Sequence, residues 1–248
     1  MSRPRLKPAT TDTPVVLDIS GDFACFTRPE AKAERISYPM MTPSAAVGVL
    51  ESIFWKPEFD YLVRRIEVLR PIKWFRIRRN EIATPPSLST IRRQGEHFHY
   101  DVTSDRDQRF TLALRDVAYR IHADIQLRPH ATEGLGKYLS QFQRRIARGA
   151  SFSHPYLGCR EFSASDFGPP EPGITAEPHD EDLGVMLLRV DRSTGRPQSL
   201  WFTAQLNAGV LRVPTEGIHD PARDAAALDA AAHGDGAVDS DLDRVGQG

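Results

Sequence analysis

Two segments with helical periodicity, separated by segments with strand alternation, constrain this chain more than any other feature. In residues 42–57, Thr42 is a good N-cap and Pro43 suits the first helical position. The apolar residues that follow recur at spacings of three and four, as a buried helix face requires: Ala46, Val47, Leu50, Ile53 and Phe54. Lys56 and Pro57 end this helix, because a residue that precedes proline disfavours helical geometry.

A second helix is predicted over residues 132–148. Its inner face consists of Leu135, Leu139, Phe142 and Ile146, and Gly149 is a natural C-terminal cap. Three arginines stand in the last turn, where cations interact favourably with the helix dipole: Arg144, Arg145 and Arg148.

Strand patterns precede, separate and follow the two helices. They are predicted over residues 14–20, 23–27, 61–82, 109–127, 183–190, 199–205 and 210–213. Residues 87–108 are polar and predict a surface loop or hairpin. The order of elements is the βαββαβ pattern of ferredoxin-like folds. We therefore expect an α+β protein with a ferredoxin-like, RNA-recognition-like core in residues 14–150. Residues 151–213 should add the remaining core strand, 183–190, and a small C-terminal antiparallel β region.

The C-terminal tail has a different composition from the rest of the chain. From residue 214 to 248 it holds eight acidic and two basic residues, with few large apolar side chains. The other 213 residues carry 30 basic and 25 acidic residues, so the overall net charge of −1 conceals a basic body. We expect the tail to be disordered. A basic body raises the odds of a polyanionic partner, although chance alone produces many such asymmetries.

The sequence gives no sign of a membrane span, a disulfide scaffold or a metal centre. No apolar run approaches the roughly 20 residues that cross a bilayer, and the basic N-terminus has no apolar core of a signal peptide behind it. Cys25 and Cys159 are the only cysteines, and the eight histidines are scattered. We expect a cytoplasmic protein with no metal and no cofactor.

A basic segment, residues 64–79, is the clearest candidate for contact with nucleic acid. It carries seven cations against one acid, with two aromatic residues among them. Guanidinium groups pair with phosphates, and aromatic faces stack on unpaired bases. The alternative is a solvated strand edge that charge keeps soluble. The predicted RNA-binding residues are Arg64, Arg65, Lys73, Trp74, Arg76, Arg78 and Arg79, together with Arg144 and Arg145 of the second helix.

Several phrases in order carry a resemblance to one family. They are GDFACFTRPE (21–30), SYPMMTPSAAVGVLESIFWKP (37–57), VLRPIKWFRIRRNE (68–81), GKYLSQFQRRIARGASF (136–152), YLGCREF (156–162) and DLGVMLL (182–188). The chain resembles the type I-C branch of the CRISPR Cas-five family over most of its folded part.

The resemblance implies a function. Such subunits cleave the repeat of precursor CRISPR RNA without metal and stay on its 5′ handle. They join an effector complex with a large subunit and a filament of backbone subunits. The alternatives are a non-catalytic subunit that only grips the handle, and a single-stranded RNA-binding module unrelated to CRISPR.

The resemblance also implies the catalytic positions, and here the sequence departs from the family. The family places an aromatic or histidine near the end of the first helix, where Phe54 stands, and a Lys-His pair where Lys137 and Tyr138 stand. Lys137 can stabilise charge, and Tyr138 can transfer protons if neighbouring cations lower its pKa. Tyr138 could instead pack at the helix edge. His154 is a further source of an imidazole, Phe54 fits the core, and Trp55 fits either the core or a base stack.

Overall fold

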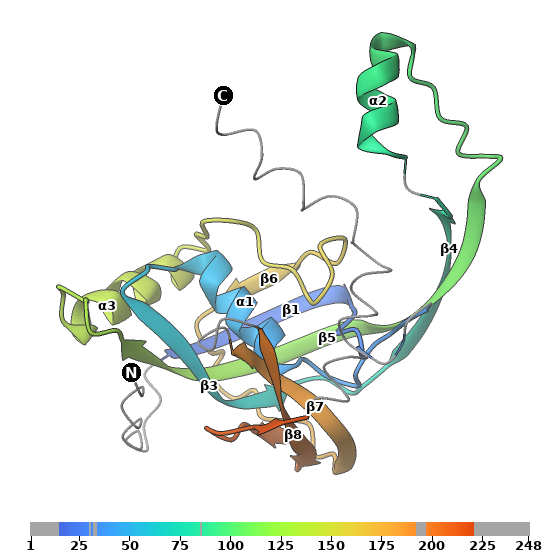
Figure 1. The fold of residues 1–248 in the computed structure, drawn as a ribbon. Helices are drawn as coiled ribbons and strands as arrows, with labels where there is room; N and C mark the ends of the chain where they lie inside the picture. Colours follow the sequence, from blue (N-terminus) through green and yellow to red (C-terminus); the bar gives the residue numbers. More distant parts are fainter. Residues whose placement is uncertain (1–14, 30, 32–33, 85, 192–196, 221–248) are drawn as a thin grey trace.

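The computed structural model describes residues 15–29, 31, 34–84, 86–191 and 197–220, and Figure 1 shows their fold. The elements are β1 (Val15–Ala24), β2 (Arg35–Ile36), α1 (Pro43–Ile53), β3 (Phe59–Val68), β4 (Trp74–Ile82), α2 (Leu88–Gln94), the 3-10 turn η1 (Gly95–His97), β5 (Arg106–Leu127), α3 (Leu135–Ile146), β6 (Asp166–Gly168), β7 (Glu181–Asp191), β8 (Gln198–Asn207), β9 (Val210–Arg212) and β10 (Ile218–His219).

The long strand β5 organises the sheet. Its second half lies between β1 and β3 and is antiparallel to both, with Ala123 opposite Val15 and Leu127 opposite Phe59. β6 pairs with the other edge of β1, which gives the local strand order β6-β1-β5-β3. Helix α1 packs against β3 and β7, α3 packs against β1 and β5, and the two helices contact each other. Both helices therefore cover one face of this part of the sheet (Figure 1).

Helix α1 begins and ends where its sequence predicts. The side-chain oxygen of Thr42 accepts a hydrogen bond from the backbone N–H of Ala45 at 3.3 Å, and Pro43 occupies the first helical position. The helix ends at Ile53, and Phe54 is already extended. Ala46, Leu50 and Ile53 are buried, so the predicted inner face is confirmed at these positions.

The inner face of α3 differs from the prediction in one respect. Tyr138, Phe142 and Ile146, each four residues apart, are its buried side chains, whereas Leu135 is 38% exposed. The side chains at 138, 142 and 146 face the sheet, because residues four apart lie on one side of a helix. Tyr138, with its polar hydroxyl, therefore occupies the buried position in the first turn that the prediction gave to Leu135. The core therefore contains the phenol ring of Tyr138 at this position.

One predicted strand assignment is wrong. Residues 183–190 lie in β7, which pairs with β8 and not with the core strands, and its residues are buried on one face only. The strand that pairs with β1 is instead β6, which is three residues long and too short for a periodic signal. The predicted antiparallel region near the C-terminus is confirmed, because β8 pairs with both β7 and β9.

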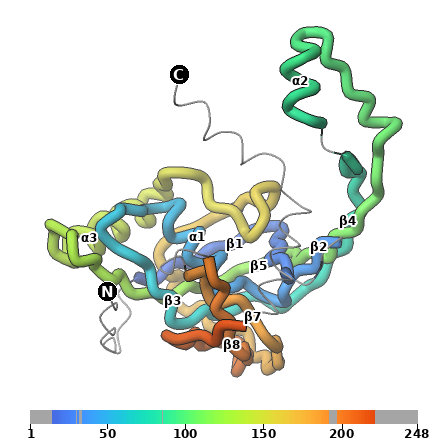
Figure 2. The backbone as a smooth tube through the Cα atoms, in the orientation of Figure 1, coloured from blue at the N-terminus to red at the C-terminus, as the bar shows by residue number. Residues whose placement is uncertain are grey.

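Strand β4 pairs with the first half of β5, and together they form an arm that leaves the body, as Figure 2 shows most clearly. The predicted extended stretch 61–82 is therefore two strands, since β3 ends at Val68 and β4 begins at Trp74. Helix α2 lies at the tip of the arm and buries none of its residues. The prediction of a loop or hairpin for residues 87–108 missed this helix, because a helix without a buried face has no hydrophobic period.

The tail prediction covers residues that the structure describes only in part. Residues 221–248 lie outside the described residues. The segment up to Asp220 departs from the prediction, because Ile218 and His219 form β10 and pair with Trp201 and Leu200 of β8. No helix among the described residues is long and apolar enough to cross a membrane.

One glycine explains part of the phrase YLGCREF. Gly158 has a φ of +86°, and a Cβ atom added there would lie 2.0 Å from the carbonyl oxygen of Cys25. The backbone N–H of Cys25 also donates to the carbonyl of Leu157 at 3.0 Å. Only glycine allows this conformation and this approach without strain. The loop 156–162 is thus held tightly against the end of β1.

Candidate RNA-binding and catalytic site

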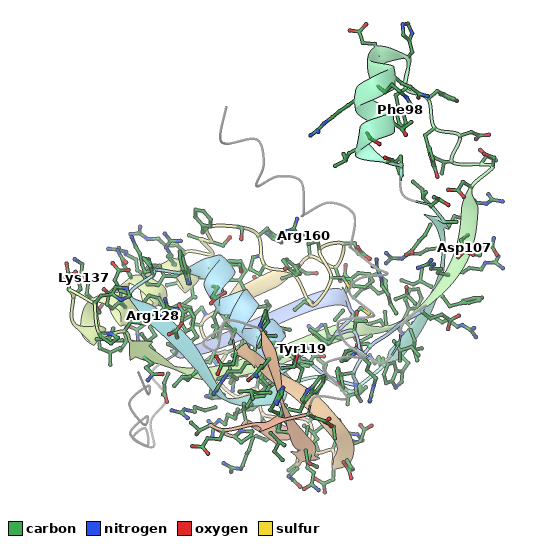
Figure 3. All side chains as sticks on the ribbon, in the orientation of Figure 1. Phe98, Asp107, Tyr119, Arg128, Lys137 and Arg160 are labelled. Carbon is green, nitrogen blue, oxygen red and sulfur yellow. The ribbon has the colours of Figure 1, made fainter. Side chains whose placement is uncertain are left out.

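Lys137 lies on the first turn of α3 with its ammonium group exposed to solvent. Its Nζ forms an ion pair with Glu133, four residues earlier. Figure 3 shows Lys137 and Arg128 at the end of the molecule opposite Phe98 on the arm. An exposed ion pair of this kind contributes little to stability, so Lys137 can exchange Glu133 for a phosphate at low cost.

Three aromatic rings gather near the start of α3. The centroid of the Phe59 ring lies 5.6 Å from that of Phe54 and 5.2 Å from that of Tyr138. The structure thus brings together positions 54 and 138, which the family resemblance linked and the chain separates by 84 residues. Phe54 is 2% exposed, in agreement with the core interpretation of this residue.

The hydroxyl group of Tyr138 is buried and, among the described residues, has no hydrogen-bond partner. Burial raises the pKa of Tyr138, and the carboxylates of Glu58 and Glu133 raise it further. Lys137 acts in the opposite direction but is the weaker influence. The expected lowering of this pKa by neighbouring cations is therefore wrong, and Tyr138 stays protonated at neutral pH.

Two further polar groups at this end of the molecule were not singled out from the sequence. Glu58 stands between Pro57 and Phe59, and its Oε2 is buried without a partner among the described residues. The Nε2 atom of His130 lies 3.0 Å from the carbonyl oxygen of Pro57. Neither residue belongs to a motif, and only the proximity of the β3 and α3 ends reveals them.

His154 makes its contact within the loop that carries it. Its Nε2 lies 2.9 Å from the carbonyl oxygen of Ala164, within the loop that follows α3. This contact holds the loop together. His130 contacts Pro57 instead, two residues before the Phe59 ring that packs on Tyr138, and is therefore the candidate imidazole at this end of the molecule.

The arginines of α3 have two distinct environments. Arg145 donates from Nη1 to the carbonyl oxygen of Ile53 at 2.6 Å, and its guanidinium lies 5.3 Å from the centroid of the Phe54 ring. Arg144 and Arg148 are exposed, and no ion pair within the described part of the chain involves them. Arg145 therefore joins α3 to the end of α1, while Arg144 and Arg148 are free to meet an anion.

Most cations of the basic segment are already paired with acids. Arg64 donates to Asp124 at 2.6 Å, and Arg65 pairs with Glu67 at 3.3 Å. A β-bulge between Val63 and Arg65 places these two arginines near different partners. The remaining pairs join Arg70 and Lys73 to Asp116, and Arg79 to Glu161.

One face of the arm keeps an exposed set of predicted RNA-binding residues. Trp74, Arg76 and Arg78 alternate with half-buried neighbours along β4, so all three project to the same side. Trp74 is 44% exposed, and Arg76 lies 4.2 Å from the centroid of the Phe110 ring on β5. No ion pair among the described residues involves Arg78, so this residue can contact a phosphate.

The described residues contain no group of three or more His, Cys, Asp or Glu side chains that could hold a metal ion. The α3 end offers the ammonium group of Lys137, the phenol of Tyr138, the carboxylates of Glu58 and Glu133, and the imidazole of His130. These groups can stabilise charge and transfer protons.

The fold and the site define an α+β protein whose antiparallel sheet and cationic helix suit an RNA ligand. The chain belongs to the CRISPR-associated Cas5 family, in its type I-C branch. The family described as "CRISPR-associated protein (Cas_Cas5)" matches residues 15–214, which is most of the chain.

Two relatives share one name with each other. A CRISPR pre-crRNA endoribonuclease Cas5d of Thermus thermophilus is 45% identical over 214 residues, covering 79% of this chain and 89% of the relative. The protein of that name from Mannheimia succiniciproducens is 38% identical over 211 residues, covering 80% of this chain and 93% of the relative.

Solved structures share the fold at lower identity. A crystal structure of a CRISPR-associated protein has a TM-score of 0.58 at 20% identity, covering 81% of this chain and 91% of its own. A functionally uncharacterised Streptococcus mutans protein, SMU1763c, has a TM-score of 0.59 at 17% identity, covering 83% of this chain and 95% of its own. These two similarities concern the fold alone.

Proposed function

We propose that this protein cleaves precursor CRISPR RNA within its repeat, without a metal ion, and stays bound to the 5′ handle in a type I-C effector complex. The large subunit and the backbone subunits of that complex would be its protein partners, and the cytoplasm its location. One observation carries the proposal. An exposed lysine, Lys137, lies on the helix that packs Tyr138 onto the Phe59 ring, which Phe54 also contacts, in a chain 45% identical to a named pre-crRNA endoribonuclease.

Metal-free cleavage requires three roles. A base assists attack of the 2′-OH on the adjacent phosphate, an acid protonates the leaving 5′ oxygen, and a cation stabilises the charge between them. Lys137 supplies the cation. Tyr138 would supply the proton, because its raised pKa keeps the hydroxyl protonated and no hydrogen bond within the described residues holds the hydroxyl in its buried position. His130 supplies an imidazole that can accept the 2′-OH proton.

We also propose that residues 15–168 contain a ferredoxin-like core. The strand order β6-β1-β5-β3, antiparallel throughout, is the order of a βαββαβ domain with helices α1 and α3 as its two crossovers. On this division, the core includes β6 as its last strand and ends at residue 168, later than the predicted boundary at 150, and the β region follows up to residue 213.

A second candidate function is a non-catalytic subunit that holds the 5′ handle while another enzyme cuts. The burial of Phe54 and of the Tyr138 hydroxyl favours it, because a buried side chain does not contact the scissile phosphate.

One experiment separates the two candidates. The purified protein is incubated with its cognate repeat RNA in excess EDTA, and the products are resolved on a denaturing gel. We expect a single cut that leaves a 2′,3′-cyclic phosphate or its hydrolysis product. Tight binding of intact RNA without any cut would establish the non-catalytic candidate and refute the proposed cleavage.

A further inference from the structure

The two most exposed aromatic side chains among the described residues lie close together in the fold. Phe152 is 85% exposed and Trp55 is 51% exposed. The exposure of apolar aromatic surface to water is unfavourable by roughly 25 cal/mol per Å². Such side chains commonly mark a site that a ligand covers.

The backbone fixes the two residues near each other. The N–H groups of Phe152 and Ser153 both donate to the carbonyl oxygen of Ser52, at 2.9 and 3.0 Å. Trp55 follows three residues after Ser52, just beyond the end of α1. The loop after α3 is thus attached to the last turn of α1, and each segment presents one aromatic residue to solvent.

The segment that carries Trp55 runs along α3. At one end the carbonyl of Ile53 accepts a hydrogen bond from Arg145, and at the other end the ring of Phe59 packs on Tyr138. Trp55 therefore lies between the Lys137 end and the Arg145 end of the helix. Those two ends are about 12 Å apart, at 1.5 Å of rise per residue.

Exposed cations flank the two aromatic residues. Lys56 is exposed beside Trp55, and the exposed Arg144 and Arg148 stand on α3 and just after it, before Phe152. Cations around exposed aromatic faces are the usual arrangement for single-stranded nucleic acid, since phosphates meet the cations while bases stack on the rings. A docking surface for a protein would favour apolar side chains over this many cations at its centre.

We propose that Trp55 and Phe152 form a platform that stacks unpaired bases of the repeat RNA next to the Lys137 site, with Arg144 and Arg148 on the adjoining phosphates. This inference rests on the proposed RNA-binding function and names the part of the RNA that the α3 face takes. Stacking is tolerant of base identity, so the platform selects for unpaired nucleotides and not for a sequence.

The test measures affinity for the cognate repeat RNA at several salt concentrations, in the full-length protein. Trp55→Ala and Phe152→Ala should each weaken binding roughly 5- to 150-fold, the range that base stacking on one aromatic residue gives. The dependence of affinity on salt should keep its slope, because stacking releases no counterions. Trp55→Phe should retain most of the affinity. Ile218→Ala, which truncates a 73% exposed apolar side chain on β10, serves as the matched control.

Three outcomes would overturn the platform. Unchanged affinity in both alanine variants refutes it, even if the wild-type protein still cuts RNA in EDTA, so that its failure is distinct from failure of the proposed function. Equal loss in Trp55→Phe and Trp55→Ala would exclude stacking as the cause. Unchanged RNA affinity combined with failure to assemble with the other subunits would assign the surface to a protein partner.

Discussion

The basic segment 64–79 and the cations of α3 look alike in sequence but differ in structure. In the basic segment, five of the seven cations form ion pairs, four of them with acids from other parts of the chain and one, Arg65, with Glu67 of the segment itself. On α3 and just after it, Arg144 and Arg148 are exposed without an ion pair among the described residues, and Lys137 pairs only with its exposed neighbour Glu133. The density of basic residues in a sequence thus overstates the charge that is free to bind RNA.

The difference has a physical origin in the sheet. Side chains on β3 and at the base of the arm face acids on β5, such as Asp124 and Asp116, because antiparallel neighbours meet across strands. A helix end that faces solvent has no such neighbours. We therefore expect the α3 face to supply most of the chemistry, and the basic segment to supply most of the structural support.

The largest difference between the two regions is expected when one lysine is removed from each. Lys137→Ala should lower the single-turnover rate of repeat cleavage about 10²–10³-fold, the usual loss for a group that stabilises transition-state charge. Lys73→Ala should have a much smaller effect, because Lys73 directly precedes β4 at the base of the arm, away from the aromatic cluster of α3. Cleavage rates at saturating RNA give both values. Equal losses in the two variants would contradict the assignment of catalysis to α3.

Within α3, the comparison can be sharpened with two adjacent arginines. Arg145→Ala should lower the free energy of unfolding by about 2–3 kcal/mol, because it removes a charged hydrogen bond to Ile53 and the stack on Phe54. Arg144→Ala should change it by no more than about 0.5 kcal/mol. Urea denaturation measures both. A stable Arg145→Ala variant would show that this residue is not the link between α1 and α3.

A smaller effect separates free from paired cations within the basic segment. Arg78→Ala should weaken RNA binding and lower the slope of affinity against salt by about 1, as the loss of one phosphate contact requires. Arg64→Ala should leave the slope unchanged, since its guanidinium is held by Asp124. Titrations between low and moderate salt give the slopes. If Arg64→Ala lowered the salt slope and Arg78→Ala did not, the phosphate contact would belong to Arg64 and not to Arg78.

The smallest expected effect concerns a thiol at the base of the arm. A hydrogen bond with Cys25 and the nearby charge of Arg35 lower the pKa of Cys159 to about 7, while burial acts against them. Alkylation of Cys159 by iodoacetamide should therefore rise with pH around a midpoint near 7, and Cys25, whose pKa is raised, should stay unmodified. Arg35→Leu should move the midpoint upward. A midpoint near 9 in the wild-type protein would refute this effect.

Much of the fold could be predicted because its signals are local. The cap of Thr42, the spacing of the α1 core residues and the alternation along β5 all depend on neighbours in the sequence. The exceptions also have local causes. β6 is too short for any period, and α2 buries no face that would produce one.

The site was less predictable because its geometry depends on distant residues. The sequence and the resemblance indicated Lys137 and Tyr138, yet the burial of the Tyr138 hydroxyl depends on Phe59, which lies 79 residues earlier. His130 and Glu58 carried no motif at all. The acids that neutralise the basic segment are likewise distant in sequence, and a one-dimensional count of charges cannot reveal them.

The most direct test of the account is to map which region touches the RNA. Repeat RNA with photoreactive 4-thiouridine at single positions is bound to the full-length protein and crosslinked, and the modified peptides are identified by mass spectrometry. The account predicts that crosslinks concentrate on the segments around Trp55, Lys137 and Phe152, with further contacts on the exposed face of β4. Crosslinks confined to residues 64–73, with none on α3 or its flanking loops, would contradict it.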